Sequence, residues 1–88
     1  MENEENVKKF ILKKLFIKGI WGAAHTSFDN LPKSLPGHLR GLAKKVAKEL
    51  IKDGLLLQKI TSYGLEVSLN PRRAEEIKNI IKEDIKIS

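Results

Sequence analysis

The clearest pattern in the chain is an apolar stripe at helical spacing over residues 37–53, "GHLRGLAKKVAKELIKD". The apolar side chains fall within an arc of roughly 140° on a helical wheel, and the basic side chains fall within an opposite arc of similar width. The pattern predicts an amphipathic helix that Gly54 ends, with one buried face and one basic face. The apolar positions are Leu39, Leu42, Ala43, Val46, Ala47 and Leu50, and the basic positions are Arg40, Lys44, Lys45, Lys48 and Lys52.

Two further helices are predicted towards the ends of the chain. Residues 6–20 repeat apolar side chains near the helical period, with Asn6 as a plausible cap and Gly19 at the end. Near the C-terminus, Asn70 caps and Pro71 opens a last helix. Its apolar face pairs most simply with the first helix.

The segment before the basic helix is interrupted by two prolines. "AAHTS", residues 23–27, predicts a short extended piece. "FDNLPK", residues 28–33, predicts a short second helix that Thr26 or Ser27 caps. The prolines keep this helix brief and place a turn before the basic helix.

The segment after the basic helix, residues 55–69, predicts a β-hairpin. Residues 65–69, "LEVSL", alternate between apolar and polar side chains as a half-buried strand does. They follow "LLLQKI" after the turn "TSYG", in which Gly64 can supply a positive φ. A helix-turn-helix followed at once by a hairpin is typical of the winged helix. The sequence thus predicts an α+β fold, a single winged-helix domain over residues 7–83 with tails at 1–6 and 84–88.

The charge is concentrated in the middle of the chain. The 88 residues carry a net charge of +6, and 41% of them are hydrophobic, enough for one packed core. Residues 7–73 hold 14 Lys or Arg against 4 acids, whereas residues 1–6 and 74–88 are both net acidic. This distribution is expected of a protein that binds polyanions. A lysine-rich solvated surface is the alternative that stays open.

Several function classes find no support in the residues. The chain has no cysteine, which excludes disulfides and thiolate metal sites and fits a reducing interior. No apolar run is long enough to span a bilayer, so we expect a cytoplasmic protein, nucleoid-associated if it binds DNA. The two histidines, His25 and His38, lack ligand spacing, and no catalytic motif occurs. We therefore expect no enzyme, no metal and no cofactor.

The basic helix is the first candidate binding element. In helix-turn-helix proteins, the second helix presents its N-terminal part to base edges in the major groove. Arg40 can donate to a guanine or to a phosphate, His38 can reach either, and Gly41 lets the backbone approach a phosphate. The phosphate-gripping lysines are Lys44, Lys45, Lys48 and Lys52.

The predicted wing and the start of the last helix supply further candidates. Thr61, Ser62 and Tyr63 offer hydroxyls and one ring to a phosphate or a minor-groove edge, and Lys59 adds charge nearby. The alternative is that Tyr63 packs over the hairpin and that the hydroxyls only shape the turn.

Arg72 and Arg73 lie in the first turn of the last helix, where positive charge opposes the helix dipole. Their position indicates an external anion. A salt bridge to Glu75 or Glu76 explains the position equally simply.

Three segments together resemble small stand-alone winged-helix proteins encoded in archaeal genomes. They are "HTSFDNLPKSLPGHLRG", "AKELIKDGLL" and "TSYGLEVSLNP", and the resemblance covers residues 7–82. It implies a winged-helix fold and, by analogy of fold, DNA binding. It carries over no functional residues.

Three functions follow as hypotheses. The first is binding of duplex DNA through residues 37–53 and the wing 55–69, as in a transcriptional regulator or a chromatin-associated protein. The second is a structured-RNA or ribosome-associated module, since winged helices serve there too and the same positive charge would suit it. A platform for single-stranded nucleic acid is disfavoured, because few aromatic residues are available to stack on its bases. The third is a protein-interaction module that docks an acidic partner. The apolar termini, including Ile85 and Ile87, either cover the core or form a homodimer seam.

Overall fold

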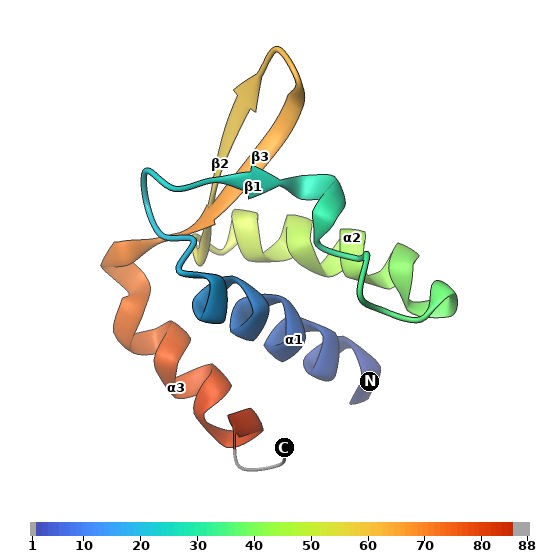
Figure 1. Cartoon of the computed structure of the whole chain (residues 1–88). Coiled ribbons are helices and arrows are strands. Elements are labelled where there is room, and N and C mark those ends of the chain that lie inside the picture. The colour runs from blue at the N-terminus through green and yellow to red at the C-terminus, as the bar shows by residue number, and fades with distance from the viewer. Residues whose placement is uncertain (1, 86–88) are drawn as a thin grey trace.

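The computed structural model describes the backbone of residues 2–85 and the side chains of residues 4–82. It consists of helices and one three-stranded antiparallel sheet, so the predicted α+β class is confirmed (Figure 1). In chain order the elements are α1 (Glu2–Lys18), β1 (Thr26–Ser27), the 3-10 turn η1 (Phe28–Asn30), α2 (Gly37–Lys52), β2 (Leu56–Thr61), β3 (Gly64–Leu69), the 3-10 turn η2 (Pro71–Arg73) and α3 (Ala74–Ile85).

The core lies where α1 packs against α2, α3 and β3. On the side of α1 that faces the core, Ile11, Leu12 and Leu15 are fully buried. Ile77 and Ile81 of α3 are equally buried, which confirms that the last helix packs on the first. Burying these side chains supplies most of the driving force for folding in a domain of this size.

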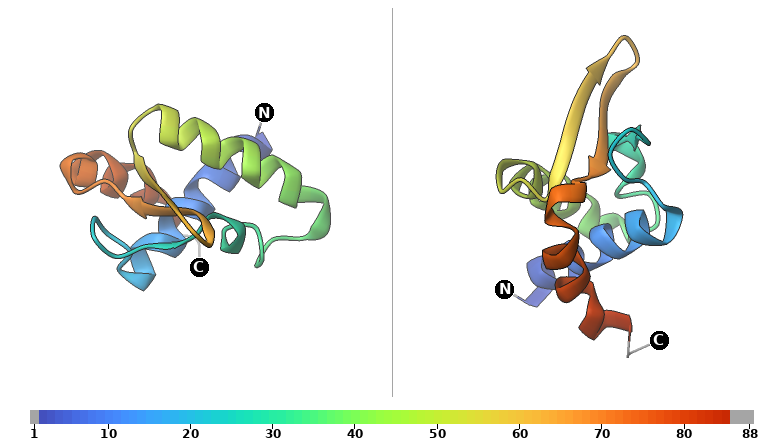
Figure 2. Two further views of the ribbon diagram at one scale, coloured as in Figure 1. Left: turned by 90° about the horizontal axis from the view of Figure 1, so that it is seen from above. Right: turned by 90° about the vertical axis from the view of Figure 1, so that its left-hand side faces the viewer.

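The sheet has the order β1-β3-β2, and its hairpin extends well beyond the body of the molecule (Figures 1 and 2). At the foot of the hairpin Leu56 pairs with Leu69, and both side chains are buried. At its tip Thr61 pairs with Gly64, which adopts φ +118° as predicted for this turn. The hairpin is therefore anchored at one end and exposed at the other.

Two predicted boundaries are wrong. Residues 2–6 belong to α1 and do not form a separate tail, and Asn6 lies within the helix. Negative side chains are favourable near a helix N-terminus, and Glu4 forms an ion pair with Lys45 that holds this end to α2. At the other end α3 continues to Ile85, and residues 86–88 of the predicted tail lie outside the described residues.

The predicted second helix is reduced to the single 3-10 turn η1. Pro32 has no N–H with which to continue an α-helix, so the carbonyl of Phe28 accepts from the Leu31 N–H instead, at 3.2 Å. A further turn closes when the Leu35 N–H donates to the Pro32 carbonyl at 3.0 Å. The two prolines thus convert the segment between β1 and α2 into successive tight turns.

Candidate nucleic-acid interface

Three lysines form a row along the outer face of α2. The opposite face is buried, with Ala43, Val46, Ala47 and Leu50 at most 3% exposed. Residues four positions apart lie above one another on a helix, so Lys44, Lys48 and Lys52 follow one another along the surface. All three are exposed, and none has a hydrogen-bond or ion-pair partner among the residues that the structure describes. We call them the lysine row.

Lys45 belongs to a different environment. Its Nζ lies 2.9 Å from Glu4 Oε2, so it joins α2 to the first turns of α1. The hydrogen bond and the charge of Glu4 raise the pKa of Lys45, and the same contact lowers the pKa of Glu4. Lys45 was predicted to grip phosphate together with the lysine row, but the structure engages it in an internal ion pair.

Arg40 is held by the loop before α2. Its Nε donates to the Leu35 carbonyl at 3.2 Å and its Nη2 donates to the Lys33 carbonyl at 3.4 Å. With Asp29, Pro32, Lys33 and Lys44, it lines a shallow hollow of about 300 Å³. These two bonds use the Nε–H and one Nη2–H of the five guanidinium donors, and they orient the guanidinium towards the loop. Arg40 therefore closes the loop that leads into α2.

The first two turns of α2 leave the backbone open. A Cβ placed at Gly41 meets no atom within 4 Å, so the domain has room for a side chain at this position. Gly37 is equally open, and His38 between them is exposed. A ligand can approach this part of α2 more closely than a helix with side chains at both positions allows.

The tip of the hairpin is uncharged and exposed. Tyr63 is 95% exposed, so the alternative that its ring packs over the hairpin is wrong. The Thr61 hydroxyl donates to the Gly64 carbonyl at 2.9 Å and accepts from the Tyr63 N–H at 3.1 Å, so it shapes the turn. Ser62 is exposed beside Tyr63.

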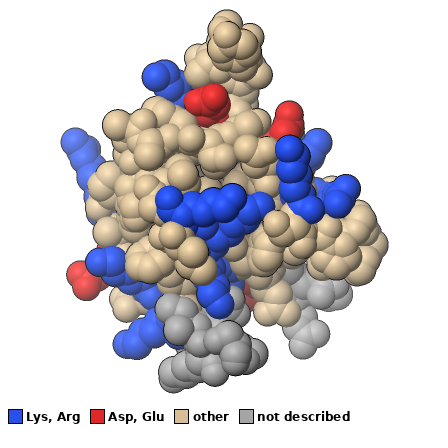
Figure 3. All heavy atoms as spheres, viewed as in Figure 1, with Lys and Arg blue, Asp and Glu red and all other residues tan. Residues whose placement is uncertain are grey.

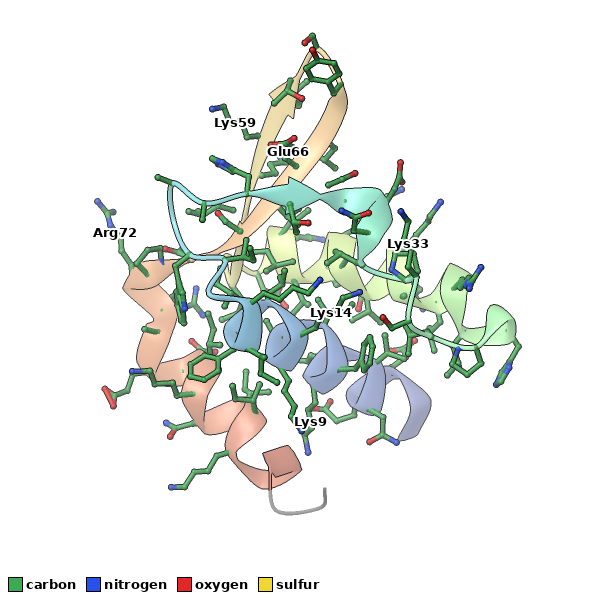
Figure 4. The ribbon with its side chains drawn as sticks, viewed as in Figure 1. Lys9, Lys14, Lys33, Lys59, Glu66 and Arg72 are labelled. Carbon is green, nitrogen blue, oxygen red and sulfur yellow. The ribbon has the colours of Figure 1, made fainter. Side chains whose placement is uncertain are left out.

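Further down the hairpin one basic and one acidic side chain face each other. Lys59 and Glu66 are paired in the strand register, and the Lys59 side chain reaches out from the hairpin (Figure 4). An opposite-charge pair across two strands is mildly stabilising. The hairpin consequently adds little net positive charge to the surface.

The two arginines before α3 have different environments. Arg73 Nη2 lies 2.6 Å from Glu76 Oε1, and its Nη1 donates to the Asp53 carbonyl at 2.9 Å. The salt-bridge alternative is therefore confirmed for Arg73, which links the end of α2 to α3. Arg72 is exposed at the margin of the molecule, and its side chain has no partner within the described part of the chain (Figure 4).

One structurally important lysine was missed by the sequence patterns. Lys14 Nζ donates to the Asn30 carbonyl at 2.9 Å and to Ser34 Oγ at 3.3 Å, so it holds the loop before α2 against α1. Burial lowers the pKa of Lys14, and the charges of Lys18 and Lys33 lower it further. The two prolines could have indicated such a contact in advance. They break the helical turns of this loop, and broken turns leave carbonyl groups that need hydrogen-bond donors from elsewhere.

No protein-family model, no curated protein and no solved structure matches this chain. Over the described residues, no helix is both long and apolar enough to cross a bilayer. The same part of the chain contains no group of three His, Cys, Asp or Glu side chains that could hold a metal ion. The exposed lysine row and the projecting hairpin make the surface of α2 and the hairpin the candidate site (Figure 1).

Proposed function

We propose that this protein is a winged-helix domain that binds duplex DNA, with α2 in the major groove and the β2–β3 hairpin as the wing. The order of elements supports the proposal, because α2 leads directly into a hairpin that projects from the domain (Figure 2). The short strand β1 pairs with β3 and completes a small antiparallel sheet at the foot of that hairpin.

The observation that carries the proposal is the lysine row. Its residues have no internal partner among those described, so their charge is available to an external anion. From Lys44 to Lys52 the helix rises by about 12 Å, which is enough to face several phosphates of a duplex. Each phosphate neutralised by a lysine releases counterions, and this release favours binding.

The proposed binding depends mainly on the DNA backbone. Arg40, the best candidate for contact with a base, is held by two carbonyls of its own loop. The segment before α2 also departs from an ordinary helix-turn-helix, since η1 replaces the helix that would cross the DNA backbone. We therefore expect a strong dependence on salt and little discrimination between sequences.

The test is fluorescence anisotropy of a labelled random-sequence duplex over a series of salt concentrations. Lys44→Glu and Lys48→Glu are compared with Lys78→Glu, which makes the same charge change at an exposed position on α3. We expect sub-micromolar binding at low salt that the two α2 variants weaken by at least about tenfold, and that the α3 variant leaves nearly unchanged.

Two outcomes would contradict the proposal. Equal weakening by all three variants would show that only the net charge matters. Preference for an unlabelled RNA hairpin over an unlabelled duplex in competition would assign the same surface to structured RNA.

A further inference from the structure

The outer side of α1 carries an apolar hollow with a basic rim. The hollow has a volume of about 370 Å³. Phe10 and Ile17 are its large apolar side chains, seven residues apart and therefore on the same side of the helix. Ile17 is 71% exposed and lies beside Phe10, so the hollow presents apolar surface to solvent. The remaining lining residues are Lys13, Lys14, Lys18 and Ser34.

The rim is positive, and no acidic side chain lines the hollow. The charges of Lys18 and Lys33 disfavour the charged form of Lys14, so positive charge is crowded here. Lys14 uses two of its three N–H donors on Asn30 and Ser34, and its Nζ also lies 6.0 Å from the centroid of the Phe10 ring. Basic side chains gather over the middle of this face in Figure 3, and Lys14 and Lys33 share it in Figure 4.

We propose that this hollow binds an acidic amphipathic helix of a partner protein. Apolar side chains of that helix cover Phe10 and Ile17, and its carboxylates pair with Lys13, Lys14 and Lys18. Amphipathic helices commonly bind in apolar grooves through side chains spaced by three, four and seven residues. Opposite charge at the rim fixes the orientation and speeds the encounter.

The apolar floor favours a protein partner over a nucleic acid. A phosphate backbone would neutralise the lysines but would leave Ile17 in water, whereas an amphipathic helix satisfies both features. The hollow lies on α1 and the lysine row lies on α2, and they share no residue. The inference is therefore independent of DNA binding.

The test uses the full chain and three labelled synthetic peptides. The first is a 14-residue helical peptide with Leu at every third or fourth position and Glu on the flanks. The second is a scrambled peptide of the same composition, and the third replaces each Glu by Lys. We expect the acidic amphipathic peptide to bind with a Kd on the order of 10 µM, and the other two to bind at least about tenfold more weakly.

Two substitutions locate the binding site. Ile17→Ser removes the exposed apolar side chain, and Ile60→Ser is its matched control, because Ile60 is 81% exposed at the tip of the hairpin. We expect Ile17→Ser to weaken binding about tenfold and Ile60→Ser to leave it unchanged. Lys18→Glu should weaken it as well, whereas Lys82→Glu on α3 should not.

Three results would overturn the inference. They are failure of the acidic amphipathic peptide to bind, equal binding of its scrambled companion, and equal binding to the Ile17→Ser variant. If duplex DNA displaces the peptide and Ile17→Ser has no effect, the lysines of α1 form a surface for nucleic acid instead.

Discussion

The two basic surfaces of this molecule differ in what lies beside their lysines. On α2 the apolar side chains of the helix are turned inward, and Gly41 leaves the helix surface open beside Lys44, at the start of the lysine row. On α1 the lysines surround exposed Ile17 and half-buried Phe10. Charge over an open backbone suits a phosphate chain, whereas charge around an apolar floor suits an amphipathic protein segment. Two surfaces with charge of the same sign can therefore bind different kinds of partner.

The largest expected effect separates the two surfaces directly. Replacing Lys44 and Lys48 together by Glu should weaken duplex binding by much more than tenfold, on the order of 100-fold. The plot of log K against log salt concentration should become shallower by about 1.8, since two phosphate contacts are lost. The same variant should bind the acidic peptide as the unchanged protein does, because the hollow lies on α1. Anisotropy with both ligands measures the two affinities side by side.

Ile17→Ser should have the opposite effect on the two affinities. It should weaken binding of the acidic peptide and leave the duplex affinity unchanged. A loss of both affinities in either variant would mean that one continuous surface serves both ligands. Circular dichroism of each variant controls for loss of the fold, which the exposure of these side chains makes unexpected.

Gly41→Ala tests how closely DNA approaches α2, because it should change stability and duplex affinity in opposite directions. Gly41→Ala should stabilise the free protein by about 0.5–1 kcal/mol, because alanine is the better helix former and its Cβ enters open space. It should nevertheless weaken duplex binding, because the methyl group keeps a phosphate away from the helix backbone. Urea unfolding and anisotropy measure the two effects.

Gly37→Ala is the natural comparison, since it is equally open and lies one turn earlier. If Gly41→Ala increases stability and binds duplex as tightly as before, close approach at Gly41 is refuted and the lysines act at longer range.

A third comparison is between two lysines of the hollow. Lys14→Met should lower the free energy of unfolding by about 1 kcal/mol, because it removes the donor that the Asn30 carbonyl uses. Lys18→Met should have almost no effect, since Lys18 is exposed and donates to no acceptor in the described residues. Urea denaturation of both variants makes the measurement. Equal stabilities would show that the contact of Lys14 with the loop contributes nothing net.

Local patterns were sufficient to predict the elements that lie nearest to the proposed site. The amphipathic period of residues 37–53 predicted α2 to within one residue, and alternation around Gly64 predicted the hairpin and its turn. Both patterns repeat over a few residues, so the sequence of each segment is enough to predict its secondary structure. The lysine row follows directly from that helix.

The contacts that modify the site could not be predicted in this way. Lys45 pairs with a residue 41 positions earlier, and Lys14 bonds a carbonyl 16 positions later. Arg40 bonds carbonyls of a loop whose shape depends on where the prolines break the helix. Only the packed chain decides which basic side chains have internal partners, and so which remain available to a ligand.

The smallest expected effect concerns Glu4, whose ion pair with Lys45 keeps that lysine from acting together with the lysine row. Because the pKa of Glu4 is lower in the folded protein than in the unfolded chain, the unfolded chain binds more protons between the two values, and stability rises with pH there. The contribution is complete above the ordinary glutamate pKa of about 4.3 and is lost as the pH falls through the folded value. Glu4→Gln should flatten this part of the stability profile, measured by urea unfolding at several pH values.

At neutral pH the same variant should bind duplex slightly more tightly, by less than about threefold, because Lys45 is released beside the lysine row. Lys45→Gln combined with Glu4→Gln is the control, and it should abolish the gain. If Glu4→Gln leaves the duplex affinity unchanged, a freed Lys45 does not reach the phosphates, and the binding surface of α2 ends at the lysine row.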